Sequence, residues 1–169
     1  LGGLFGDRPP RLASILEAAS RMASCPIVTV NLWFDRVVLD GPLVGLPGRT
    51  MQWVFDKRLA FGDRASHVSL VSSGAEAVVS RSNEELIALA IGELVQAIPE
   101  SRRARLTRAT VVREKRATFS LAPGQPARPG TTTPVKDLFL AGDWIATGLP
   151  ATIESAVASG HRAADAARQ

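Results

Sequence analysis

The sequence is poor in several features, and each shortage excludes a class of protein. Its single cysteine, Cys25, excludes an internal disulfide and a multi-cysteine metal site, and is compatible with a reducing compartment. No apolar run approaches the roughly 18 residues that indicate a transmembrane helix. No G-x-G-x-x-G motif follows a predicted strand, so a complete dinucleotide fingerprint is missing. What remains is a globular chain with 46% apolar residues for a core.

The N-terminus also lacks two common features. It begins Leu1-Gly-Gly-Leu, with no charged start followed by an apolar stretch, so we expect no signal peptide. It has no initiator methionine, which is consistent with a piece of a longer protein. His67 and His161 are isolated from other ligand residues, so no metal site is expected, and both are interpreted as ordinary surface or partly buried histidines.

Positive charge is in modest excess, with 20 basic and 16 acidic residues and only three lysines. The densest basic stretch, residues 102–108, fits either a solvated helix end or a surface attracted to anionic lipid head groups. No aromatic residues interleave with these arginines, so we expect no nucleic-acid partner. We expect a cytoplasmic protein whose contact with a membrane, if it has one, is peripheral.

The first two thirds of the chain predict a helix feeding a small sheet. Helical spacing occupies residues 9–24, and strands are predicted at 26–35, 51–55, 67–73 and 109–119. One face of the first strand is fully apolar: Val28, Val30, Leu32 and Phe34. The other face carries Asn31 and Trp33 among mixed residues, and we expect it to border a cavity.

Other segments of this region carry further signals. Ser82 and Glu85 form a predicted capping box for a helix that Pro99 ends. In the second strand, Met51, Trp53 and Phe55 are predicted to share one side. Glycine and proline indicate long loops at residues 39–50 and 123–130.

The last third predicts a strand at Leu138–Ala141, a turn at Gly142-Asp143 and a helix from about Pro150 to Ala167. Proline suits the first helical turn, which would leave backbone N–H groups free on Ala151, Thr152 and Ile153. These donors could hold an anion or a carbonyl oxygen, and Asp143 could accept hydrogen bonds from sugar or ribityl hydroxyls. An ordinary strand–loop–helix packing unit is an equal alternative on composition alone.

A resemblance favours the first interpretation. Leu138-Phe-Leu-Ala-Gly-Asp-Trp144 and Gly148-Leu-Pro-Ala-Thr-Ile-Glu-Ser-Ala-Val-Ala-Ser-Gly160 resemble the C-terminal FAD-binding motif of the amine oxidase and carotenoid desaturase superfamily. Residues 26–35, 51–56 and 113–119 resemble the squalene-associated FAD-dependent desaturases, also described as hydroxysqualene dehydroxylases. The resemblance extends over residues 24–165 or so and identifies the chain as the C-terminal portion of such a protein.

The resemblance implies an α+β fold: a small mixed or antiparallel sheet with flanking helices, plus the terminal strand and helix of an FAD-binding Rossmann-type domain. Residues 1–135 would belong to the substrate domain and 136–169 to the FAD domain, whose remainder supplies the glycine-rich turn. Gly142 would allow close backbone approach, and Asp143 would lie near the FAD ribityl and pyrophosphate groups. The helix start, at Ala151, Thr152 and Ile153, would face the flavin ring.

Two further residues of the motif have implied roles. Glu154 matches the family's glutamate and would be structural, since a carboxylate is favoured near a helix N-terminus. Ser155 stands where many relatives have glycine, which is a mild departure.

The implied activity is oxidoreduction of a long apolar isoprenoid, most specifically reductive conversion of hydroxysqualene to squalene on the way to hopanoids or carotenoids. Trp33, Phe34, Trp53 and Phe55 would either line an isoprenoid tunnel or pack in the core. No catalytic side chain is predicted, because much of the chemistry in this family belongs to the flavin.

Three alternatives stay open. The first is a phytoene-type desaturase. The second is a flavin amine oxidase, which the absence of tyrosine disfavours, since an aromatic cage would be expected near the flavin. The third is a stand-alone module without redox activity that binds a lipid or a partner.

Overall fold

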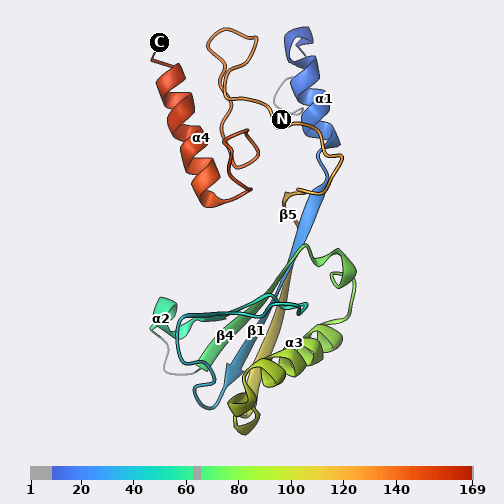
Figure 1. Ribbon diagram of the computed structural model, residues 1–169, viewed down its shortest axis with the longest axis vertical. Coiled ribbons are helices and arrows are strands. Elements are labelled where there is room, and N and C mark those ends of the chain that lie inside the picture. Colours follow the sequence, from blue (N-terminus) through green and yellow to red (C-terminus); the bar gives the residue numbers. More distant parts are fainter. Residues whose placement is uncertain (1–8, 63–65, 169) are drawn as a thin grey trace. The chain divides into compact units, whose positions relative to one another are not determined.

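A computed structural model of the chain describes residues 9–62 and 66–168 (Figure 1). The chain forms two compact units. The first comprises Leu1–Ser24 with Thr118–Gln169, and the second comprises Cys25–Ala117. The second unit is the middle of the chain, so the first is assembled from the two ends.

A five-stranded sheet is the framework of the second unit in the described residues. Its order is β2-β3-β4-β1-β5. The strands are β1 (Ser24–Phe34), β2 (Leu43–Gly45), β3 (Trp53–Asp56), β4 (Ser66–Ser73) and β5 (Leu106–Phe119). The pairs β1–β4, β3–β4 and β2–β3 are antiparallel. The predicted α+β class with a small antiparallel sheet is therefore confirmed.

The two faces of this sheet differ as the alternation in β1 predicts. Side chains of one face of β1 are buried against helix α3 (Asn83–Ala97), which lies along that face in Figure 1. The helix contributes Leu86, Ala90 and Leu94, all fully buried. Burial of each large aliphatic side chain contributes roughly 1.5–3 kcal/mol, so this layer is the main source of stability in the unit.

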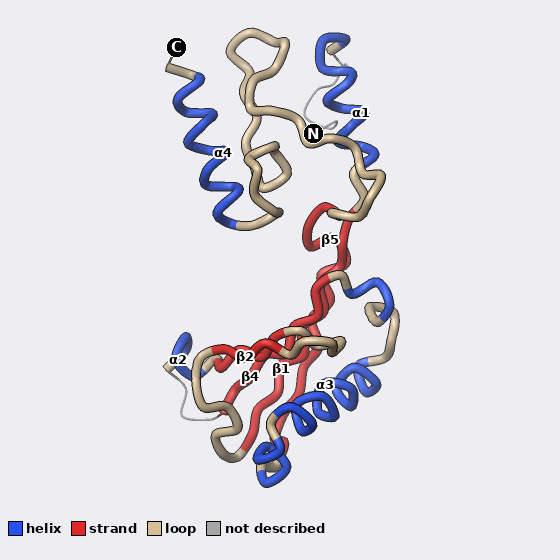
Figure 2. Tube along the Cα trace, viewed as in Figure 1, coloured by secondary structure: helices blue, strands red, loops and turns tan. Residues whose placement is uncertain are grey.

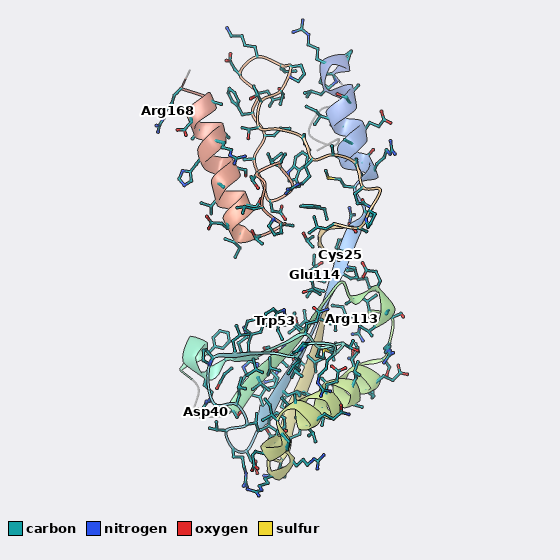
Figure 3. The ribbon with its side chains drawn as sticks, in the orientation of Figure 1. Cys25, Asp40, Trp53, Arg113, Glu114 and Arg168 are labelled. Atoms are coloured by element: carbon teal, nitrogen blue, oxygen red, sulfur yellow. The ribbon has the colours of Figure 1, made fainter. Side chains whose placement is uncertain are left out.

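Helix α3 begins at the predicted capping box. The Ser82 hydroxyl accepts from the Glu85 N–H at 3.2 Å, and the Glu85 carboxylate accepts from the Ser82 N–H at 2.8 Å. Arg113 of β5, labelled in Figure 3, donates from its guanidinium to the carbonyl oxygens of Val79 and Arg81 and to Asn83 Oδ1. Arg113 therefore has a structural role, because it fixes the segment that leads into the helix.

Two details of the second unit differ from the sequence-based predictions. Strand β2 lies within the predicted loop 39–50, where it pairs with β3. Met51 is fully buried in the core, whereas Trp53 is 44% exposed, so these residues do not share a side. Glu93 of α3 accepts from the N–H groups of Thr50 and Met51 at 3.0 and 2.7 Å, which holds Met51 on the helix side before the strand begins.

The first unit contains helix α1 (Ala13–Arg21), a preceding 3-10 turn at Pro10–Leu12 and helix α4 (Ile153–Ala166). Figure 2 shows that most of the chain between β5 and α4 is loop. The pairing of residues 138–141 is shorter than predicted: it consists of one bridge between Thr132 and Phe139 and the bond from Leu140 N–H to the Thr131 carbonyl. A longer ladder needs neighbouring strands, and the described residues offer only this short segment.

Helix α4 starts later than the predicted Pro150. Thr152 has an extended backbone and is the N-cap, since its hydroxyl accepts from the Ser155 N–H at 3.2 Å. A threonine cap satisfies a donor of the first turn, which proline at position 150 cannot do. The helix therefore begins at Ile153.

Candidate functional site

The face of the sheet opposite α3 carries a cavity of about 390 Å³. Alternate residues of β1 and β4, together with β3 and the segment after it, form its lining: Thr29, Asn31, Trp33, Phe55, Lys57, Phe61, His67, Ser69 and Val71. The prediction that the mixed face of β1 borders a cavity is thus confirmed. Trp33 and Phe55 lie in the lining, as expected of substrate-contacting residues, although their role stays a prediction.

The other two aromatic candidates lie elsewhere. Trp53 lines a separate hollow of about 370 Å³ with the β2–β3 connection at residues 45–48. Phe34 is only 4% exposed and belongs to the core under α3, which agrees with the packing alternative for this residue.

His67 is the residue of the cavity that the sequence interpretation undervalued. It is 8% exposed, and its imidazole stacks on the Trp33 indole with ring centroids 4.1 Å apart. The register explains the contact, because Trp33 of β1 is directly opposite His67 of β4. The alternation of His67, Ser69 and Val71 with buried Val68 and Leu70 was the signal that could have placed His67 on this face.

Three polar side chains form one hydrogen-bonded group in the cavity wall. Asn31 Oδ1 accepts a hydrogen bond from the Ser69 hydroxyl at 2.5 Å and lies 3.3 Å from His67 Nε2. An amide oxygen can only accept, so His67 donates from Nε2. These bonds fix the Asn31 amide in one orientation.

An ion pair between Asp56 and Arg58 lies next in sequence to the cavity residues Phe55 and Lys57. Arg58 donates to the buried Asp56 carboxylate from Nε, at 2.8 and 3.1 Å, and from its backbone N–H at 2.9 Å. Burial alone would raise the pKa of Asp56, but the hydrogen bonds and charge of Arg58 outweigh it and lower that pKa. Arg58 also donates to the Leu39 carbonyl, which ties the short helix α2 (Arg58–Phe61) to the preceding loop.

In the first unit, Gly142 occupies a position that only glycine tolerates. Its φ is +137°, and a Cβ there would lie 2.7 Å from Cδ1 of Trp144. The Trp144 indole occupies the space that a side chain at position 142 would need, and the close approach of this glycine to a flavin stays a prediction.

Two buried serines attach the loop that follows Gly142 to helix α4. Ser159 Oγ accepts from the Gly142 N–H at 2.8 Å and lies 3.0 Å from its carbonyl oxygen. Ser155 Oγ lies 2.6 Å from Thr147 Oγ1 and 3.3 Å from the Asp143 carbonyl oxygen. Ser155, which departs from the family's glycine, thus has a role of its own in holding this loop.

Several polar groups of this loop and of the first turn of α4 have no partner in the part of the chain that the structure describes. The half-buried Asp143 carboxylate has no hydrogen-bond or ionic partner among the described residues. The N–H groups of Ile153 and Glu154 likewise find no acceptor within the described part of the chain. The N–H groups of Ala151 and Thr152 also bond no acceptor among these residues, so the assignment of Ala151, Thr152 and Ile153 to cofactor binding stays a prediction.

The sequence model of the family of flavin containing amine oxidoreductases matches residues 6–168 of the chain. The chain belongs to this family. Hydroxysqualene dehydroxylases of Sinorhizobium fredii and Rhodopseudomonas palustris are 38% and 39% identical over 94% and 93% of the chain. A 15-cis-phytoene desaturase of an Oncidium hybrid is 28% identical over 90% of the chain and 28% of its own length.

The solved structures agree at the level of the fold. An oxidoreductase from Methanosarcina mazei matches 95% of the chain and 38% of its own length, with a TM-score of 0.65 at 13% identity. The chain spans 37% and 36% of the length of the two dehydroxylases. The resemblance found from the motifs is confirmed, as is flavin as the cofactor of the family.

The Asp56–Arg58 pair generates a pH-dependent prediction. Because the pKa of Asp56 is below its ordinary 3.8 in the folded protein, the pair stabilises fully above that pH and loses its effect as the pH falls further. Asp56→Asn should lower the free energy of unfolding by about 1–3 kcal/mol at pH 7. Thermal melting from pH 7 to pH 3 should show the two proteins converging at the acid end. A difference that stays constant from pH 7 to pH 3 would contradict this role.

Proposed function

We propose that this chain is the C-terminal part of an FAD-dependent oxidoreductase acting on a long isoprenoid, with hydroxysqualene as substrate and squalene as product. The supporting observation is the loop from Gly142 to Thr147, held against α4 with an unpartnered carboxylate and free N–H donors beside it. The two dehydroxylase relatives at 38–39% identity favour this substrate over phytoene, because the phytoene desaturases reach only 26–29%. The product class would feed hopanoid or carotenoid synthesis.

The loop fits a flavin on chemical grounds. Asp143 would accept hydrogen bonds from ribityl hydroxyls. The N–H groups of Ile153 and Glu154, in the first turn of α4, would donate to a carbonyl oxygen of the flavin ring. Gly142 keeps the backbone free of a side chain, while Ala151 and Thr152 set the entry to the helix. When bound, the flavin supplies hydride chemistry, and the protein supplies position and environment.

The two compact units suggest which residues bind the substrate and which bind the flavin. We assign Cys25–Ala117, with its sheet and cavity, to the substrate domain, and the remaining unit to the FAD domain. This moves residues 9–24 and 118–135 from the predicted substrate portion to the flavin portion. On α4, Ile153 is 85% exposed and Val157 is also exposed, which suits packing against the remainder of the FAD domain.

We expect a cytoplasmic protein, and a peripheral membrane contact would give it access to an isoprenoid dissolved in lipid. None of the described helices has the length and apolarity to cross a bilayer. Arg102, Arg103, Arg105 and Arg108 are exposed beside partly exposed Leu106. Such a cluster suits anionic head groups.

Vesicle binding tests that contact. The double variant R102Q/R103Q should weaken co-sedimentation with anionic phospholipid vesicles by roughly tenfold or more, since each arginine contributes about 1 kcal/mol near a charged surface. R11Q/R168Q, which removes two other exposed arginines, is the control for net charge. Equal loss in both variants, or no loss in either, would speak against a specific contact.

Product analysis tests the proposed activity. The complete, FAD-loaded protein should convert hydroxysqualene to squalene when a reductant is supplied, and should leave phytoene and amines unchanged when an electron acceptor is supplied instead. Desaturated phytoene as the main product would identify the desaturase alternative, and amine oxidation would identify the amine oxidase. A complete protein that stays colourless and takes up no FAD would leave the stand-alone binding module.

Asp143→Ala tests the flavin contact separately. Loss of a carboxylate that accepts ligand hydroxyls should weaken FAD affinity by about ten- to a hundredfold, with the melting temperature of the apoprotein unchanged. Flavin absorbance after desalting measures the retained cofactor. Asp165→Ala, at an exposed position in the last turn of α4, is the matched control. Equal flavin retention in wild type and Asp143→Ala would refute the assignment.

A further inference from the structure

The wall of the sheet cavity is mostly aromatic and aliphatic, with a polar group at one place. Trp33, Phe55, Phe61 and Val71 supply apolar surface. The hydrogen-bonded group of Asn31, His67 and Ser69 lies among them, from the adjacent strands β1 and β4. Thr29 and Lys57 also line the cavity, and the Lys57 ammonium lies over the Phe55 ring at 5.6 Å.

The hydrogen bonds within this group determine what it offers to a ligand. Asn31 Oδ1 accepts from Ser69 and His67, so the oxygen is satisfied and the Nδ2 amine is turned away from both. No acceptor among the described residues binds Nδ2, and this atom is not buried from solvent, which leaves its N–H donors open to the cavity. Ser69 has donated its only hydroxyl hydrogen and keeps lone pairs to accept.

The neighbouring aromatic rings keep this group in place. The Trp33 indole stacks on the His67 ring. The Arg108 guanidinium lies over the Trp33 ring, with its Cζ 4.7 Å from the ring centroid. The strand register places Asn31 directly opposite Ser69, and Trp33 directly opposite His67. Polar groups on two paired strands are therefore fixed by the sheet itself and do not depend on a loop.

We propose that Asn31 and Ser69, oriented by His67, receive the hydroxyl group of an isoprenoid alcohol. An alcohol accepts from one donor and donates to one acceptor, which is the pair that Asn31 Nδ2 and Ser69 Oγ present. The aromatic lining takes the carbon chain. A hydrocarbon in the same place would leave these polar groups unpaired, so the group selects alcohol over hydrocarbon. This inference rests on the proposed function and names the residues that set its substrate class.

The test compares two ligands that differ by one hydroxyl, hydroxysqualene and squalene. Their dissociation constants for the complete, FAD-loaded protein are measured by quenching of tryptophan fluorescence. The wild type should prefer hydroxysqualene by about tenfold or more. Asn31→Leu should abolish the preference while squalene binds as well as before or better. Thr29→Val removes a hydroxyl from the same cavity outside the hydrogen-bonded group, and it should keep the wild-type ratio.

An unchanged ratio in Asn31→Leu, or an equal loss of both ligands, would overturn the role of the group. Equal affinity of the wild type for both ligands would overturn it too, with the proposed function intact if squalene is still formed from hydroxysqualene. A wild type that binds neither ligand would overturn both proposals. If Asn31→Leu fails to fold, as judged by thermal melting, Ser69→Ala is measured with the same expectation.

Discussion

The register between β1 and β4 is the constraint on which the rest of the sheet unit depends. Alternate residues of β1 face either the α3 core or the cavity, so a slip of one residue would exchange the two sets completely. The cost of exposing Val28, Val30 and Leu32 makes that slip prohibitive. The same register that buries the core therefore brings Asn31 to Ser69 and Trp33 to His67. Packing of the core face thus determines which polar and aromatic side chains meet in the cavity.

Features with a local cause could be predicted from the sequence. The alternation of β1 and the capping box of α3 each need only residues close in the chain, and both are present as expected. The position of Met51 could not be predicted, because it depends on Glu93 some forty residues away. Likewise, the start of α4 is decided by competition between Thr152 and Pro150 for the first turn, which spacing alone does not settle.

In the candidate sites, too, the roles that depend on contacts between distant residues could not be predicted from the sequence. The family motif pointed to Gly142 and Asp143. The role of Ser155 and Ser159, which bond the backbone of these two residues, is visible only in the folded loop against α4. His67 has no distinguishing sequence neighbours and becomes informative only opposite Trp33. In both places polar side chains are buried in pairs that satisfy one another, and the group left over is the one that a ligand could use.

We propose that the Gly142–Thr147 loop binds flavin and that the face of the sheet opposite α3 binds the isoprenoid. A crystal structure of the complete protein with FAD and an isoprenoid alcohol tests it most directly. We expect FAD within hydrogen-bonding distance of the Asp143 carboxylate and the Ile153 N–H, and a carbon chain in contact with Trp33 and Phe55. A flavin that contacts neither Asp143 nor α4, or an isoprenoid held outside this cavity, would contradict it.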